Sequence, residues 1–350
     1  MQKDMHFFGI FALARAAGMR IGAAKTVANA SEYVDDAIWD KDFYQDKGQC
    51  ILTEMTAHKT LDLKNADSED QRKVWLPFHF LPGGEGNTVT DRLVCRMNSR
   101  IAKAMVKTNT AIAAEAPYGL YLLGITAHVY ADTFAHYGFL GANDECNAIK
   151  TGSIELKVND HGVLDYIENK AKSFWNEMLS YGLSQIFPLG HGAAATYPDR
   201  PYLRWAYTSE EDNTRVEREN PNDFVLACKA LYEMFKTYLD KKPNHAEAGV
   251  AKSWQKIRTP VKEIIEKEGA KEERIQAWKN VMRAGRLFGG NVTIPTYKGK
   301  EWSDSLNEIE SKGFPDNPVR LPVYNFYQAA RMHRAQMLSD LLPAKGIIAA

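Results

Sequence analysis

Two histidines and an aspartate are evenly spaced along the most apolar segment of the chain, GITAHVYADTFAHYGF at residues 124–139. His128, Asp132 and His136 recur every four residues, so in a helix each step turns the side chain by only about 40° and all three share one face. Burying three ionisable groups without partners is costly. Because two imidazoles and a carboxylate suit zinc or a similar divalent ion, the stripe predicts a metal site on a buried helix. The alternative is a hydrogen-bonded His–Asp ladder.

Polar residues elsewhere could complete such a site. His6 falls on an apolar helix face, and His79 lies between two phenylalanines in PFHFLP. His191 lies in GHGAAATYPD, where glycine permits close backbone approach. In SEYVDDAIW, helical periodicity places Asp35 on a row of small and apolar residues and Asp36 on a polar row. Asp35 is therefore the favoured inward carboxylate, and Asp36 stays open as a base or as an orienter of the ligands.

Helical periodicity predicts the elements that must position these residues. The expected helices cover residues 3–17, 22–39, 91–114, 117–139, 165–186, 223–239, 246–267, 271–285 and 321–342. No convincing strand alternation appears, so the predicted class is all-α, a multi-helix bundle around a buried metal site with long irregular loops. We expect a metal-binding core over residues 1–210 and a helical extension over residues 211–350 packed on it, or one single domain.

Composition bounds the functional classes. The 44 Lys and Arg residues equal the 44 Asp and Glu residues, which argues against a protein that coats nucleic acid. The four cysteines are far apart, without CxxC motifs, and indicate free thiols in a reducing compartment. No run of about 20 apolar residues predicts a transmembrane helix. Residues 7–17 do not read as a cleaved signal, so we expect a cytoplasmic protein, or one exported without a cleaved signal peptide.

The order of the motifs over residues 1–205 resembles the zinc-dependent phospholipase C and single-strand-specific nuclease superfamily. The matching positions are an early histidine (His6), an Asp motif (Tyr33-Val34-Asp35), an aromatic-flanked histidine (His79), a His-x-x-x-Asp pair (His128 and Asp132) and two later histidines (His136 and His191). The resemblance implies an all-α enzyme in which these residues hold up to three zinc ions, with Asp132 bridging metals. The AHVYADTFAHYGF and PFHFLP segments also resemble those of an uncharacterised group of microbial proteins.

Two departures from the superfamily pattern bear on catalysis. The last histidine of the superfamily is usually followed four residues later by Asp or Glu, whereas His191 is followed there by Ala195. Asp199 and Asp36 are the candidates to fill that place. The superfamily pattern also begins with a tryptophan whose amino group binds metal, where this chain has Met1.

The stripe and the resemblance together predict a metal-dependent phosphodiester hydrolase with one to three zinc-like ions, which would activate water for in-line attack on phosphorus. Asp35 and Asp36 are the predicted catalytic carboxylates. The substrate would be a phospholipid headgroup or a nucleic acid, and the balanced charge favours neither. The alternative is a non-catalytic helical protein that keeps a structural metal or a His–Asp network.

Overall fold

The computed structural model describes residues 1–350 except 46–47, 60–61, 181–188, 291 and 349–350. The α-helices are α1 (Ile10–Ala16), α2 (Ile21–Asp36), α3 (Ser68–Asp70), α4 (Leu76–Phe78), α5 (Val89–Leu93), α6 (Arg100–Glu115), α7 (Gly119–Ala135), α8 (His161–Ser180), α9 (Asn220–Lys241), α10 (Trp254–Ile265), α11 (Lys271–Arg283), α12 (Gly299–Lys312) and α13 (Pro322–Ala335). The π-helical turns are η1 (Asp4–Gly9), η3 (Gln71–Trp75) and η9 (Gln336–Leu341). The 3-10 turns are η2 (Leu63–Ala66), η4 (Glu145–Asn147), η6 (Gly192–Ala194), η7 (Pro243–His245), η8 (Pro318–Arg320) and η10 (Pro343–Lys345).

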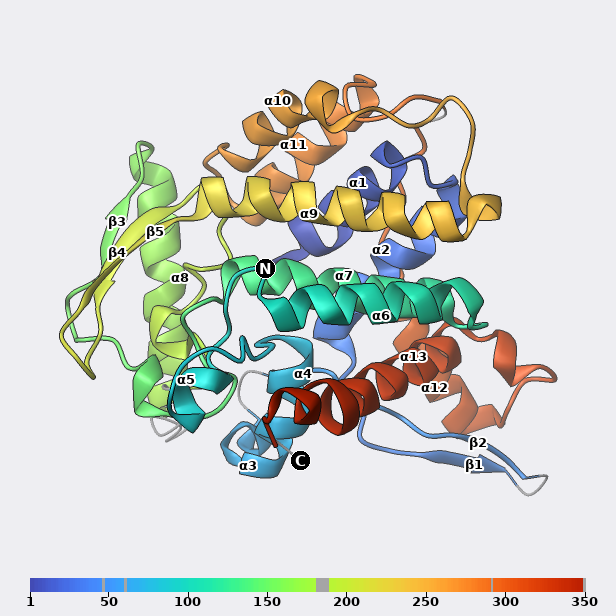
Figure 1. The fold of residues 1–350 in the computed structure, drawn as a ribbon, viewed down its shortest axis with the longest axis horizontal. Helices are drawn as coiled ribbons and strands as arrows, with labels where there is room; N and C mark the ends of the chain where they lie inside the picture. Colours follow the sequence, from blue (N-terminus) through green and yellow to red (C-terminus); the bar gives the residue numbers. More distant parts are fainter. Residues whose placement is uncertain (46–47, 60–61, 181–188, 291, 349–350) are drawn as a thin grey trace.

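Helix α7 lies at the centre of the bundle and packs against α2, α6, α9 and α13 (Figure 1). Apart from Leu120 and Tyr121, every residue of α7 is buried, as its apolar composition predicts. The main hydrophobic core joins residues from both sides of position 210, for example Leu122 of α7, Phe224 of α9 and Tyr327 of α13. The C-terminal helices thus pack on the N-terminal helices in one core. No helix among the described residues is both long and apolar enough to cross a membrane.

Helices α7 and α2 pack closely at Gly124. A Cβ atom added at Gly124 would lie 2.5 Å from the carbonyl oxygen of Val27 and 2.7 Å from the Cβ of Ala30. The absence of a side chain therefore lets the two helices touch backbone to backbone. This contact brings the end of α2, with Asp35, next to the face of α7 that carries His128.

Two small antiparallel sheets show that the predicted all-α class is wrong. Strands β1 (Phe43–Gln45) and β2 (Gln49–Ile51) form a hairpin, and β4 (Arg204–Thr208) pairs with both β3 (Glu155–Lys157) and β5 (Arg215–Glu219). These strands are too short to show clear alternation, and β5 reads RVERE, with charges on both faces. The chain is a helix-rich mixed α/β protein.

The prediction of one continuous helix over residues 91–114 is wrong. The segment divides into α5 and α6, separated by a turn in which Asn98 has a φ of 50°. Ser99 then caps α6 by accepting a hydrogen bond from the Ala102 N–H. The helix predicted over residues 165–186 begins earlier, at His161, and its predicted end falls outside the described residues.

Candidate metal centre

The stripe on α7 forms one wall of a buried polar cluster. His128, Asp132 and His136 are 0%, 1% and 4% exposed. The carboxylate of Asp132 is the hub, because its Oδ1 lies 3.1 Å from His6 Nε2, and its Oδ2 lies 3.2 Å from His128 Nε2 and 3.4 Å from His79 Nδ1. The structure therefore brings together histidines that are far apart in the sequence around one predicted carboxylate.

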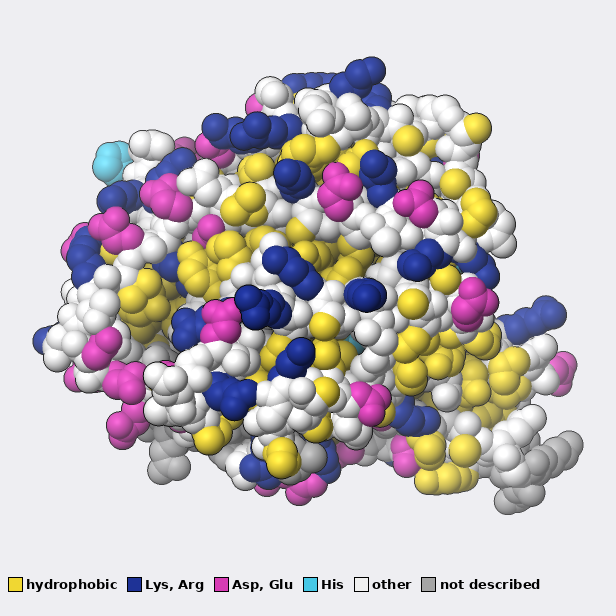
Figure 2. All heavy atoms as spheres, in the orientation of Figure 1, with side chains coloured by type: hydrophobic (Ala, Val, Ile, Leu, Met, Phe, Trp, Pro, Cys, Tyr) yellow, Lys and Arg dark blue, Asp and Glu magenta, His cyan; other side chains and the backbone are white. Residues whose placement is uncertain are grey.

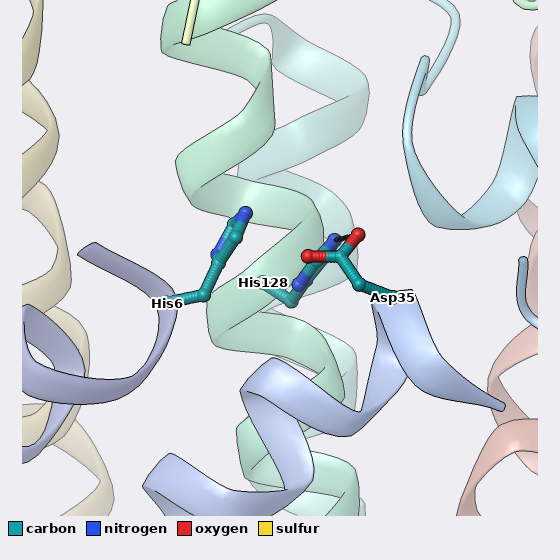
Figure 3. A group of neighbouring side chains, drawn as sticks. All are labelled: His6, Asp35 and His128. Atoms are coloured by element: carbon teal, nitrogen blue, oxygen red, sulfur yellow. Dashed lines mark ion pairs between the residues drawn. The ribbon is translucent and has the colours of Figure 1, made fainter. Parts of the chain in front are cut away.

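The two N-terminal helical segments supply the opposite wall. Figure 3 shows His6, Asp35 and His128 pointing toward one another from η1, α2 and α7. The His6 ring stacks on the His128 ring at a centroid distance of 3.8 Å. His6 Nε2 lies 3.1 Å from Asp132 Oδ1, but neither nitrogen of His6 forms a well-aligned hydrogen bond among the described residues. Asp35 Oδ1 lies 3.8 Å from both His128 Nε2 and His79 Nδ1. An ion pair from Arg274 to Asp4, at 2.8 Å, holds η1 in this position.

Backbone carbonyl groups fix the orientation of most of the clustered histidines. One ring nitrogen lies 2.7–2.9 Å from a carbonyl oxygen in each of these pairs: His128 Nδ1 with Ser31, His79 Nε2 with Thr56, His136 Nδ1 with His79, and His191 Nδ1 with Ala195. Because a carbonyl oxygen only accepts, the nitrogen facing it must carry the proton. In the neutral imidazole the opposite nitrogen is then an acceptor, and it faces the cluster.

This orientation leaves two lone pairs facing each other. His128 Nε2 and His79 Nδ1 lie 3.3 Å apart, and in their neutral forms neither nitrogen can donate to the other. A cation between them, a proton or a metal ion, resolves the conflict. Two nitrogens that bind the same zinc ion at about 2.0–2.1 Å lie a little over 3 Å apart, so the observed separation fits shared coordination.

A second group of possible ligands lies at the other end of the stripe. His136 Nε2 is 3.0 Å from Asp199 Oδ1, and His191 Nε2 is 3.7 Å from Asp199 Oδ2. Asp199 was predicted only as a candidate to fill the gap at Ala195. The Ala195 carbonyl oxygen accepts from His191 Nδ1, and the Asp199 carboxylate lies beside His191 Nε2.

The main-chain nitrogen of Met1 lies between the two groups. In this structure it is a charged amino group, and it lies 2.6 Å from Asp132 Oδ1, 3.1 Å from Asp199 Oδ1 and 3.4 Å from His136 Nε2. Burial lowers the pKa of this amino group, but the charges of Asp132, Asp199 and Asp35 outweigh burial and raise the pKa to about 11. The carboxylates thus stabilise positive charge at this point of the cluster. The superfamily pattern has a metal-binding amino group of a tryptophan where this chain has Met1.

Three groups of the cluster have charge states at neutral pH that suit metal ligands. Burial raises the pKa of Asp132, but the charges of His136, the Met1 amino group and His128 hold it well below its usual range. Burial also raises the pKa of Asp199, but the charges of the Met1 amino group and His191 outweigh burial and lower this pKa. Burial lowers the pKa of His191 to about 4. Two ionised carboxylates and a neutral imidazole are therefore available as ligands.

The predicted residues form three compact ligand groups. Within each group the ligand atoms lie within 4.8 Å of one another; the groups are His6 with Asp35 and His128, His79 with His128 and Asp132, and His136 with His191 and Asp199. Asp36 is the predicted site residue that the structure places elsewhere. It accepts a hydrogen bond of 2.6 Å from the Tyr297 hydroxyl at the surface, because it points to the polar side of α2.

The cluster opens into a pocket of about 240 Å³, whose walls include Trp75, Phe80 and Phe174. The side chain of Asp35 is 38% exposed and is the most accessible of the carboxylates in the ligand groups. On the face shown in Figure 2, basic and acidic side chains are interspersed and histidine is nearly absent. This view agrees with the burial of the clustered histidines.

Metal binding is expected to weaken as the pH falls through the pKa of His79. Burial lowers this pKa, but the hydrogen bond and charge of Asp132 and the charge of Asp35 outweigh burial and raise it above its usual value of 6.5. A protonated imidazole cannot bind metal, so below this pKa one competing proton weakens the affinity by about tenfold per pH unit. Competition with a chromogenic chelator at pH 6, 7 and 8 measures the slope. A constant affinity over this range would contradict the assignment of His79 as a ligand.

Comparison with known proteins gives one family match. The model of DUF6765, described as a family of unknown function, matches residues 1–341. No curated protein and no solved structure matches the chain.

Proposed function

Since the chain belongs to DUF6765, a family of unknown function, we propose its function from the site itself: a metal-dependent hydrolase of phosphodiesters. The proposed ligands of one to three zinc-like ions are His6, Asp35, His79, His128, Asp132, His136, His191 and Asp199. When bound, such ions supply an activated water and stabilise the negative charge of the reacting phosphate.

The observation that carries this proposal is the pair of opposed nitrogens, His128 Nε2 and His79 Nδ1. The other ring nitrogens, His128 Nδ1 and His79 Nε2, carry the protons because they face the carbonyl groups of Ser31 and Thr56. A change of tautomer would break these hydrogen bonds, so it cannot relieve the contact between the two lone pairs. The lone pairs, together with Asp132 Oδ2 at 3.2 and 3.4 Å, converge as ligands of a cation. The phosphodiester part of the proposal rests on the resemblance in motif order and on three ligand groups within one cluster.

The residues of the pocket have separate proposed roles. The carboxylate of Asp35 reaches the pocket and is the group that would accept a proton from the attacking water. Trp75, Phe80 and Phe174 exclude bulk water on the facing wall and can pack against the apolar part of a substrate. Asp36 has no role in this proposal, because it is turned away from the pocket.

Elemental analysis and hydrolysis of bis(4-nitrophenyl) phosphate test the proposed function together. The purified chain is expected to contain at least one zinc-like ion, and its turnover should be lost with a chelator and restored by zinc. His191→Ala should lower turnover by at least about 100-fold. The matched control is His161→Ala, since His161 is exposed at the start of α8. A firmly bound ion without chelator-sensitive turnover would favour a structural metal instead, and no ion with no turnover would favour a metal-free His–Asp network.

A further inference from the structure

A larger groove continues from the metal pocket across the surface. Its volume is about 810 Å³, and it shares Met1, Asp35, Phe174 and Thr196 with the walls of the metal pocket. A substrate with one end in the metal pocket can therefore extend into this groove without leaving the protein surface.

The groove is rich in basic side chains, although the chain as a whole has no net charge. The basic residues that line it are Lys3, Lys59, Lys170, Arg200 and Lys271. The acidic residues in its walls are Glu32, Glu177 and Asp35, and Lys3 lies 3.9 Å from Glu32. In the part of the chain that the structure describes, Lys59, Lys170 and Lys271 form no ion pair. The groove thus presents positive charge that the protein itself does not neutralise.

Arg200 is the most unusual member of this group. It is 3% exposed, donates a hydrogen bond of 3.0 Å to the Thr196 hydroxyl, and lies 5.4 Å from the centre of the Tyr166 ring. Its buried Nε has no hydrogen-bond partner, and no carboxylate of the described residues lies within 4.0 Å of the guanidinium. A buried cation without a counter-charge is costly to the folded protein, so this position favours an anion.

The other buried arginines make more or stronger hydrogen bonds than Arg200, although Arg15 and Arg218 also have a buried Nε without a partner among the described residues. Arg15 pairs with Glu247, Arg274 pairs with Asp4, and Arg218 donates to the carbonyl groups of Ala135 and Tyr137. Arg218 also lacks a carboxylate within 4.0 Å among the described residues, but it donates to two carbonyl groups. Arg200 has the single hydroxyl acceptor of Thr196 and lines the groove.

We propose that this groove binds a second phosphate group of the substrate, beyond the one that is hydrolysed. Phosphate offers several charged acceptors to arginine and lysine, which a neutral or zwitterionic group does not. The second phosphate could belong to the next unit of a nucleotide strand or to a phosphorylated headgroup. The inference rests on the proposed function for the first phosphate, and it selects doubly phosphorylated substrates over those with a single phosphodiester.

Matched substrates that differ by one phosphate test this selection. The dinucleotide TpT and its 5′-phosphorylated form pTpT provide one pair, and glycerophosphoinositol with and without a 4-phosphate provides the other. We expect the added phosphate to lower KM by about tenfold in at least one pair, and the pair that shows the effect identifies the source. The double variant Lys170→Gln/Lys271→Gln should reduce the preference to twofold or less. The control, Lys172→Gln, removes a neighbouring lysine that pairs with Glu168 outside the groove and should keep the preference. Equal KM values within both pairs would overturn the inference.

Binding of inorganic pyrophosphate in the presence of a chelator separates this inference from the proposed function, because it needs neither metal nor turnover. Calorimetry is expected to show binding to the full chain that the double variant weakens at least tenfold and Lys172→Gln does not. Such binding in a protein that hydrolyses no phosphodiester would refute the proposed function while still supporting an anion site in the groove. Binding that is unaffected by the double variant would refute the groove, whatever the hydrolysis assays show. Circular dichroism spectra confirm that the variants are folded.

Discussion

Replacing Asp132 with asparagine is expected to abolish metal binding by the group of His79, His128 and Asp132. It should also lower phosphodiester turnover by at least about 100-fold. The Asp132 carboxylate lies within 3.4 Å of His6, His79, His128 and the Met1 nitrogen, so no other side chain in the cluster contacts as many possible ligands. Asparagine keeps the size of the side chain but removes its charge. His79 and His128 would then lack the nearest of the anions that balance a divalent ion.

The depressed pKa of Asp132 predicts that its replacement also lowers the stability of the folded protein. Burial raises the pKa, but the charges of His136, Met1 and His128 lower it well below 3.8, so the carboxylate is ionised throughout the neutral range. A carboxylate with a depressed pKa stabilises the folded state above its unfolded pKa, and this contribution is lost as the pH falls through the folded pKa. The asparagine variant would lack this contribution at every pH above that window. We therefore expect lower stability of the metal-free variant at pH 7 as well as the loss of metal.

The matched control is Asp36→Asn, because Asp36 lies outside the pocket. Its carboxylate accepts from the Tyr297 hydroxyl at the surface, so metal content and turnover should remain those of the unchanged protein. Metal content by elemental analysis, turnover and the urea midpoint are measured for both variants. An Asp132→Asn protein that folds and keeps its full metal content would remove Asp132 from the ligand set.

Replacing Gly124 with alanine is expected to destabilise the fold by about 2–3 kcal/mol, a large effect for one methyl group. The added Cβ would lie 2.5 Å from the Val27 carbonyl oxygen, 2.7 Å from the Ala30 Cβ and 3.0 Å from the Ser31 nitrogen. Two of these three atoms belong to the backbone of α2, so no flexible side chain can move aside. The two helices would have to separate at this contact.

The same substitution should reach the metal centre, because Ser31 contacts both. Its nitrogen borders the Gly124 site, and its carbonyl oxygen accepts from His128 Nδ1 at 2.8 Å. Moving α2 would shift this carbonyl group and weaken the orientation of His128, with a loss of metal affinity of about 10–100-fold. Gly22→Ala is the matched control. A Cβ atom at Gly22 meets no other atom within 4 Å, so alanine there should be neutral or stabilise α2 by up to about 1 kcal/mol. Equal urea midpoints for the two variants would contradict the packing argument.

The parts of the site that lie on helices could be predicted from the sequence. The four-residue spacing of His128, Asp132 and His136 predicts a common face. The structure places His128 and Asp132 on α7 and His136 at its C-cap, with all three in one cluster. Periodicity also distinguished Asp35, which reaches the pocket, from Asp36, which does not. In both cases the residues recur with the period of the helix, so the local sequence pattern predicts which side chains point toward the core.

The parts that depend on loops and short strands could not be predicted in the same way. Asp199 lies in a stretch without helical periodicity, and its position is set by tertiary contacts with His136 and His191. The strand β5 buries Arg218 on a face where the alternation rule expects an apolar residue. The carbonyl oxygens of Ser31 and Thr56 have no sequence signature at all, because every residue has a carbonyl group.

The π-helical turn η1 has a consequence for changes in chain length. The Ile10 N–H donates to the Met5 carbonyl oxygen, five residues back, so this turn holds one residue more than an α-helical turn. Deleting Phe8 would allow an ordinary α-helix and would rotate His6 by about 100° relative to α1. The ring would then leave its stack on His128. We therefore expect related chains to tolerate insertions and deletions in loops such as residues 83–87, while the number of residues between Asp4 and Gly9 stays constant even where their identities drift.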